Sequence, residues 1–235
     1  MENQAIVDLI DKTAESRAGD GDGMWYCELI VCLAALAKGE FASLVYNKAI
    51  TGMDPETDRD GRKRVWELLR EAALKVTPVT TNWRVFKALV PIIQVMDPLD
   101  VPDAGGFHTF TLGDAEKKKG EAWLARAYGE ERATREIAVT NKYAPDYGDY
   151  LRMVIASIFD DEKIFNFLQT ETLLILAMIS QNEYQMTATH VLAYVRNGGT
   201  KGGVRLLIKF AEEVAEAIGQ KIVGFPGLDE LLGTV

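Results

Sequence analysis

Cysteine and histidine are the scarcest residue types in this sequence, with two of each among 235 residues. Cys27 and Cys32 stand five positions apart in an apolar run, a spacing that fits neither a zinc site nor a disulfide framework. We therefore expect both to be buried free thiols in a reducing, intracellular compartment. Neither His108 nor His190 has a motif around it, so a nucleophile–histidine active site is not indicated. We expect His190 at a helix surface or half-buried, and neither enzymatic activity nor a cofactor.

Long hydrophobic runs and a basic leader are also missing. No apolar stretch reaches the ~18 residues that a membrane-spanning helix needs. Residues 1–7 lack the basic start and apolar core of a signal peptide. These absences predict a cytoplasmic protein without membrane contact. The net charge of −9 argues against a generally cationic coat for nucleic acid, but 26 Lys and Arg residues leave room for local basic surfaces.

Alternation of apolar and polar residues, the signature of a half-buried strand, is absent from every segment of useful length. Apolar residues instead recur at helical spacing, most clearly as a stripe over residues 65–76. Residues 24–37 and 172–180 are apolar on nearly every side, which is typical of a fully buried helix. The pattern predicts an all-α fold with ~10 helices.

The turn-rich segment over residues 97–113 is the best candidate for a linker. We therefore divide the chain into an N-terminal lobe (residues 1–97), a connector (98–134) and a C-terminal lobe (135–235). Each lobe owns one of the all-round-apolar helices, which two separate helical cores would require. The connector carries a lysine- and alanine-rich helix over residues 115–128, which we expect to be largely solvated.

Residues 56–67 come closest to a chemistry-bearing motif. The oxygen ligands and the glycine of a calcium-binding EF-hand loop would be supplied by Glu56, Asp58, Asp60, Gly61 and Glu67. However, Pro55 stands where the entering helix should end, three basic residues follow the glycine, and no second loop occurs. We prefer an acidic turn that leads into a helix, with Asp58 or Asp60 as its cap. We predict no metal site, and a calcium-responsive module at residues 56–67 is the alternative.

Basic residues are clustered in spite of the acidic total. The cations that we expect to contact the phosphates of a nucleic acid are Lys63, Arg64, Lys142, Arg196, Lys201 and Arg205. Three of them surround a glycine-rich segment, residues 197–203, whose backbone amides suit an anion. That segment lacks the Ser or Thr after the lysine of a P-loop, and a flexible connection between helices is its structural alternative.

Aromatic residues add a second element of such a surface. Tyr143, Tyr147 and Tyr150 fall in what we expect to be an aromatic turn, and their rings could stack on bases. If the two lobes face each other across the connector, the basic and aromatic groups would line one cleft. A cleft of this kind binds a phosphate backbone without reading the sequence of bases.

Two helical lobes, a basic connector, an apolar tail and few catalytic residue types together resemble the nucleoprotein, or nucleocapsid protein, of a negative-strand RNA virus. Residues 182–194, with the glycine-rich turn and amphipathic helix that follow, are similar to the C-terminal lobe of such proteins, and residues 23–50 to the core of the N-terminal lobe. The resemblance implies a capsid protein of the virion that holds single-stranded RNA between its lobes. It also implies self-assembly into a homo-oligomer by exchange of terminal arms, here residues 1–18 and 222–235.

The alternative from a different class is a helical scaffold or regulatory protein that binds protein partners and no nucleic acid. Its binding surface would be the apolar tail or the surroundings of Trp25 and Trp83.

Overall fold

The computed structural model describes residues 2–17, 22–102, 108, 110, 111, 113–223, 225 and 227–234. These residues form helices and connecting turns and no strand, so the predicted all-α class is confirmed. Most of the segment 19–23, which follows the predicted N-terminal arm, lies outside the described residues.

The α-helices of the described residues are α1 (Glu2–Arg17), α2 (Met24–Ala35), α3 (Ala42–Ala49), α4 (Arg59–Val76), α5 (Asn82–Val95), α6 (Asp114–Tyr128), α7 (Glu130–Tyr143), α8 (Pro145–Val154), α9 (Phe167–Ser180), α10 (Tyr184–Arg196), α11 (Lys201–Ala217) and α12 (Leu228–Gly233). Shorter helical turns are η1 (Gly39–Phe41), η2 (Pro98–Asp100) and the π-helical η3 (Ile155–Phe159), which continues α8.

Several helix boundaries follow from single residues. Thr81, Asn166 and Thr200 cap α5, α9 and α11, and each side chain accepts a hydrogen bond from the backbone N–H three residues later. Pro145 begins α8, where its fixed φ and missing N–H suit the first helical turn. The aromatic turn that we expected over residues 143–150 is therefore mostly helix.

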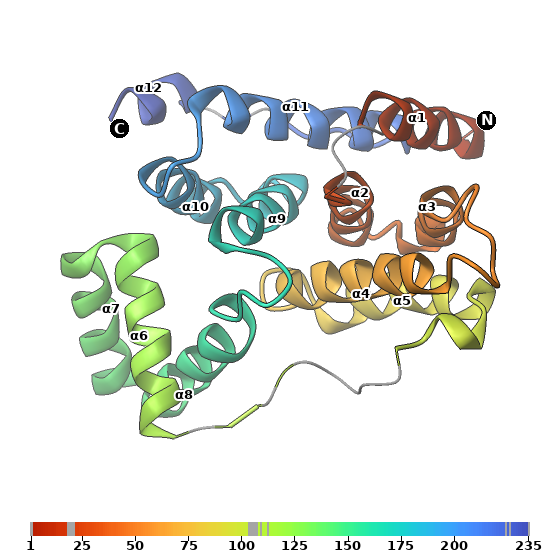
Figure 1. Cartoon of the computed structure of the whole chain (residues 1–235). Coiled ribbons are helices and arrows are strands. Elements are labelled where there is room, and N and C mark those ends of the chain that lie inside the picture. Colours follow the sequence, from red (N-terminus) through yellow and green to blue (C-terminus); the bar gives the residue numbers. More distant parts are fainter. Residues whose placement is uncertain are drawn as a thin grey trace.

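The two all-round-apolar helices, α2 and α9, pack against each other at the centre of the molecule (Figure 1). Every residue of α2 except Trp25 is buried. Both helices belong to one hydrophobic cluster that also includes residues of α1, α3, α4, α5, α10, α11 and α12. Our expectation of a separate core around each apolar helix is therefore wrong. Periodicity indicates that a helix is buried, but it does not indicate which helix covers it. The boundaries near residues 97 and 134 stay a prediction.

A second hydrophobic cluster joins α6, α7, α8 and η3 to one side of α9 and α10. Its largest member is Trp123 of α6, which is 2% exposed and lies 5.2 Å from the Phe159 ring, centroid to centroid. α6 is therefore not the largely solvated helix that we expected. Gly120, Trp123, Leu124 and Ala127 form a buried stripe at 3,4-spacing, which a count of large apolar residues alone passes over.

Both predicted arms lie against other parts of the same chain. α1 packs on α11 and α3 through Ile6, Leu9 and Ile10, and α12 packs on α10, with Leu232 buried. In Figure 1, α1, α11 and α12 follow one edge of the molecule, and the two termini are at its opposite ends.

The two cysteines are buried free thiols, as predicted. Burial raises the pKa of the Cys32 thiol to about 12, so this group stays protonated at neutral pH. Among the described residues, no helix has both the length and the apolar character that crossing a bilayer requires.

Candidate functional site

The segment that resembles a calcium loop is a turn followed by a helix. Asp54 Oδ1 accepts hydrogen bonds from the backbone N–H groups of Glu56 (2.7 Å) and Thr57 (3.0 Å). Asp58 is the N-cap residue of α4, and its carboxylate accepts from the Asp54 N–H at 2.9 Å. The segment is thus the acidic turn leading into a helix that we preferred, with Asp58 at the N-cap position, although the Asp58 side chain makes no capping hydrogen bond to α4.

The calcium alternative stays a prediction, and the geometry gives it no support because the helix begins earlier than in a calcium loop. Asp60 and Glu67 lie within α4, so they cannot converge with Glu56 and Asp58 on one ion, as the ligands of a 12-residue loop must. Glu67 instead forms an ion pair with Arg64 at 3.3 Å. In the described part of the chain, no group of three or more acidic, histidine or cysteine side chains is arranged to hold a metal ion.

Arg62, the first residue of the basic cluster at residues 62–64, belongs to a structural network around Asp100. Arg62 and Arg59 both bind Asp100, a fully buried carboxylate that also accepts a hydrogen bond from the Tyr46 hydroxyl at 3.0 Å. Burial alone would raise the pKa of Asp100, but the hydrogen bonds from Arg62, Arg59 and Tyr46 outweigh it and lower that pKa. The network holds η2 against α4, so Arg62 stabilises the contact between these two elements.

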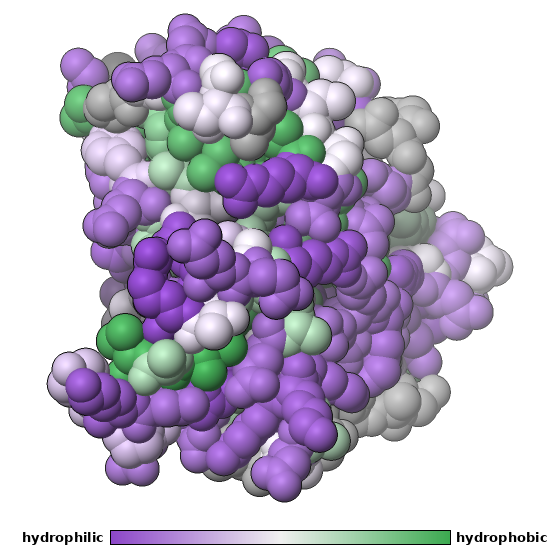
Figure 2. All heavy atoms as spheres, turned by 90° about the vertical axis from the view of Figure 1, so that its left-hand side faces the viewer, coloured by the Kyte–Doolittle hydropathy of each residue, from purple (hydrophilic) through white to green (hydrophobic). Residues whose placement is uncertain are grey.

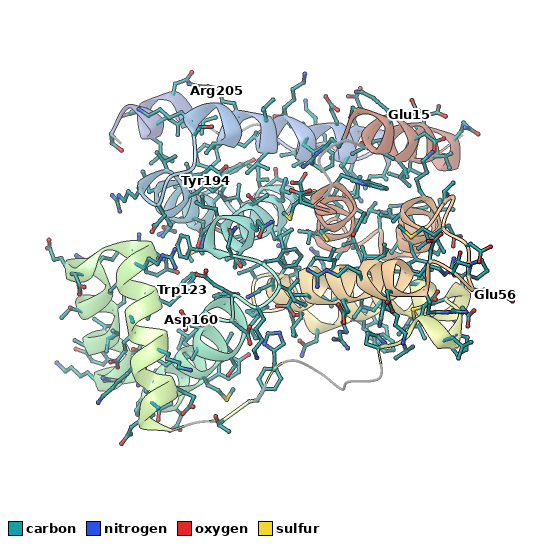
Figure 3. All side chains as sticks on the ribbon, in the orientation of Figure 1. Glu15, Glu56, Trp123, Asp160, Tyr194 and Arg205 are labelled. Atoms are coloured by element: carbon teal, nitrogen blue, oxygen red, sulfur yellow. The ribbon has the colours of Figure 1, made fainter. Side chains whose placement is uncertain are left out.

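The six predicted phosphate contacts come from four helices. Lys63 and Arg64 lie on α4, Lys142 near the end of α7, Arg196 at the end of α10, and Lys201 and Arg205 on α11. Arg205 forms an ion pair with Asp229 of α12 at 2.7 Å and projects outward from α11 (Figure 3). Arg196 and Lys201 are exposed, and neither forms an ion pair with a described residue. The structure thus brings three of the six together, at the turn between α10 and α11.

Two further arginines extend this group across α10. Arg126 of α6 donates from Nε to the Asn197 Oδ1 at 3.2 Å, and Asn197 donates back to the Arg126 carbonyl at 3.3 Å. Arg132 of α7 donates to the Thr189 Oγ1 of α10 at 3.0 Å. Arg126 and Arg132 thus contact α10, Arg196 ends α10 and Lys201 begins α11, and we call these four residues the basic seam. Glu162 and Glu136 pair with the two arginines from α6 and α7, so the seam is only partly neutralised.

Three of the four glycines in the glycine-rich segment have a local structural reason. A Cβ on Gly199 would lie 2.1 Å from the Tyr194 ring, and one on Gly203 would lie 3.0 Å from the Tyr194 hydroxyl. Gly198 has φ of +106°, a conformation that favours glycine. The segment is therefore a tight turn closed over Tyr194, and its structural alternative, a connection between helices, accounts for it.

The three tyrosines lie beyond the seam, at the end of α7 and on α8. Tyr143, Tyr147 and Tyr150 are each more than half exposed. The Lys142 ammonium lies 4.8 Å from the centre of the Tyr143 ring, a cation–π contact. Proteins that bind single-stranded nucleic acids combine exposed aromatic rings with cations in this way.

Both histidines are paired with buried glutamates, and His190 is fully buried, whereas we expected it at a helix surface or half-buried. His190 of α10 is 2% exposed, and its Nδ1 lies 2.8 Å from the Oε2 of Glu171 on α9. His108 lies 2.7 Å, through Nε2, from the Oε2 of Glu71 on α4. Hydrogen bonding to Glu71 raises the pKa of His108 against the opposing effect of burial. A lone glutamate at the start of an apolar segment, as at Glu171, is the sequence signal that we passed over.

A pocket of about 480 Å³ opens beside His190. Its walls come from α6, α7, α8, η3, α9 and α10, and most of its lining is apolar or aromatic. Tyr128 forms one wall with its ring 6.0 Å from the His190 ring, in an edge-to-face arrangement. Burial, followed by the charge of Glu171, raises the pKa of Tyr128 to about 12, so it stays a neutral phenol. Sequence reasoning missed this pocket because its residues are spread from residue 78 to residue 190.

Comparisons of this chain with protein-family models, with curated proteins and with solved structures find no match.

Proposed function

We propose that this protein binds single-stranded RNA through the phosphate backbone and assembles with copies of itself, as the nucleoprotein of a negative-strand RNA virus does. The observation that supports the proposal best is the basic seam. Arg126 and Arg132 reach α10 from α6 and α7, and they continue the line of Arg196 and Lys201. A row of cations with exposed aromatic rings near one end suits a flexible, negatively charged strand.

The surface around the seam is consistent with a solvated contact for such a strand. Figure 2 views the molecule from the side of α6 and α7 and shows a face that is mostly hydrophilic, with two separate hydrophobic patches. Lys142, at the tyrosine end, and Arg205, beyond Lys201, would extend the contact in the two directions. Lys63 and Arg64 lie on α4 and would need a different part of the strand.

Salt dependence of binding tests the seam directly. Affinity for a fluorescein-labelled 20-mer of uridine would be measured by anisotropy between about 50 and 200 mM NaCl. Replacing Arg196 and Lys201 by alanine removes two phosphate contacts, so the slope of log K against log salt should flatten by about 1.4. A control variant, K12A/K87A, makes the same change in net charge on α1 and α5, away from the seam. Equal slopes for both double variants, or no binding by the unmodified protein, would sink the proposal.

Assembly is tested by light scattering on a size-exclusion column, with the ratio of absorbance at 260 and 280 nm before and after nuclease. The proposal expects a particle larger than a monomer, rich in absorbance at 260 nm and altered by nuclease. A monomer free of nucleic acid would contradict it.

A second candidate function is self-association through α5 without nucleic acid, a form of the protein-interaction scaffold. Trp83 and Phe86 are 63% and 54% exposed, and their rings stack at 5.6 Å. With Val90 and Ile93 they follow the i, i+3, i+7, i+10 spacing of a helix-to-helix seam. The same stripe on a second copy would be its natural complement. This candidate expects a nuclease-resistant oligomer that W83S/F86S converts to a monomer, and an unchanged oligomer in that variant would refute it.

A further inference from the structure

The pocket beside His190 has walls built from two parts of the second hydrophobic cluster. α6, α7, α8 and η3 form one side, and α9 and α10 form the other. Leu124, Ile155 and Met178 supply apolar surface, and Tyr128 and Phe159 supply aromatic surface. A volume of about 480 Å³ is within the range of small-molecule sites, which are mostly apolar with a few placed polar groups.

The polar group in the wall is the pair of His190 and Glu171. Glu171 is fully buried, its Oε2 lies 2.8 Å from His190 Nδ1, and its Oε1 has no hydrogen-bond partner among the described residues. His190 is 98% buried and lines the pocket. Its second nitrogen, Nε2, forms no hydrogen bond within the described part of the chain. Nε2 is not one of the fully enclosed side-chain atoms that lack a partner, so it reaches the pocket and is open to a ligand there.

The pair leaves one ring nitrogen to meet a ligand. Nδ1 is engaged with Glu171, so Nε2 is the atom that His190 offers to the pocket. An imidazolium that faces the carboxylate carries a hydrogen on Nε2, and so does a neutral imidazole whose Nδ1 accepts from a protonated carboxyl group. In either arrangement the pocket presents one N–H donor in an apolar and aromatic surface.

We propose that this pocket is a binding site for a small, neutral, planar molecule, an aromatic ring that carries a carbonyl or amide oxygen, and that this oxygen accepts a hydrogen bond from His190 Nε2. The ring packs between Tyr128 and the aliphatic wall. The charged groups at the pocket, Arg132 and Arg152 with Glu136 and Glu183, balance one another, so a neutral ligand fits better than an ion. The site does not depend on RNA binding.

Histidine scarcity makes the test direct, because a protein labelled with ¹⁵N-histidine has signals from two imidazole rings only. The probe is benzamide, and the control is benzylamine, which has the same ring but an aminomethyl group, charged at neutral pH, in place of the amide. Two-dimensional ¹H–¹⁵N spectra should show a hydrogen on Nε2 of His190. Benzamide should shift that signal with a Kd on the order of 1 mM. The His108 signals should stay in place, and benzylamine should shift neither ring.

Two variants separate loss of the site from loss of the fold. E171L/H190F replaces both members of the pair by apolar side chains of similar size, which avoids an unpartnered carboxylate in the core. Met186→Trp fills the pocket from its half-buried edge and leaves the pair intact. Both should retain the helical circular dichroism spectrum and lower benzamide affinity at least tenfold, measured by ligand-detected NMR.

Three results would overturn the proposal. The first is a His190 tautomer with hydrogen on Nδ1 and none on Nε2. The second is an unshifted His190 signal at about 20 mM benzamide, well above the expected Kd. The third is binding of benzamide that survives in E171L/H190F.

Discussion

Gly120 lies where α6 crosses the backbone of α8, and Gly120→Ala should weaken that crossing. A Cβ at this position would lie 2.5 Å from the Arg152 carbonyl oxygen and 2.9 Å from the Arg152 Cα. Both atoms belong to the backbone of α8, so no side-chain rotation can relieve the contact. The two helices would have to move apart by roughly half an ångström, which a close-packed interior resists.

The size of the effect follows from two opposing terms. Overpacking against a rigid neighbour costs about 3 kcal/mol. The higher helix propensity of alanine offsets about 1 kcal/mol of this. The expected net loss in the free energy of unfolding is about 2 kcal/mol, or a fall of about 6 °C in Tm for a chain of this size. Thermal and urea unfolding followed by far-UV circular dichroism would measure both quantities.

Gly202 provides the matched control. It lies in the first turn of α11, and a Cβ there would come no closer than 3.9 Å to the Thr200 Oγ1. Gly202→Ala should therefore raise stability by about 0.5 kcal/mol, since alanine restricts the unfolded chain without a steric penalty. A Gly120→Ala variant as stable as the parent protein, or two variants that shift in the same direction, would refute the close crossing of α6 and α8.

Three further predictions concern buried charges. Lys75 donates to the carbonyls of Ile158, Phe159 and Asp161, so Lys75→Met should lower the free energy of unfolding in urea by about 3 kcal/mol. The same substitution at exposed Lys118 should change it by less than about 0.5 kcal/mol, and equal losses in the two variants would refute the structural role of Lys75. Because the pKa of His108 is raised above 6.5, its contribution to stability is complete below that pH and is lost as pH rises through the raised value. The stability difference between the parent and His108→Gln should thus shrink from about pH 6 to about pH 9, and a constant difference would contradict the pairing with Glu71. The pKa of Asp100 is lowered from 3.8, so its contribution to stability is present above that pH and is lost in acid. Asp100→Asn should therefore lower the free energy of unfolding by about 3 kcal/mol at pH 7 and by little near pH 2, as measured by Tm.

The sequence alone predicts which helices are buried more successfully than it predicts how they meet. The stripe over residues 65–76 is the buried face of α4. Most of residues 24–37 and all of residues 172–180 are buried, in and next to α2 and α9. These agreements reflect hydrophobic periodicity, which is a local property. Contacts between α2 and α9 join residues more than a hundred positions apart, and no local pattern indicates them. The composition of α6 misled us because one tryptophan and three smaller residues bury a face that looks poor in apolar residues.

The basic surface shows the same division between local and distant information. Arg196 and Lys201 are close in sequence, and their proximity in space was predictable from the short turn between α10 and α11. Arg126 and Arg132 join them only because α6 and α7 pack on α10, with hydrogen bonds to Asn197 and Thr189. An acidic chain can therefore hold a basic line whose members come from different helices.

Three glutamates are buried in the core, and one of them belongs to the site that we infer. Glu28 on α2, Glu71 on α4 and Glu171 on α9 are each at least 95% buried. Glu28 faces Arg17, a permanent cation, and Glu71 is shared between His108 and Lys75. Glu28 and Glu71 therefore both have cationic or histidine partners, which is enough to explain these two glutamates as structural links. Glu171 has His190 as its one hydrogen-bonding partner among the described residues, its second carboxylate oxygen has none there, and His190 lines a pocket. Packing alone does not require that arrangement, because an apolar pair of equal volume would fill the same space at a lower desolvation cost. A ligand that completes the hydrogen bonding of His190 accounts for it, and the tautomer of that single ring decides the question.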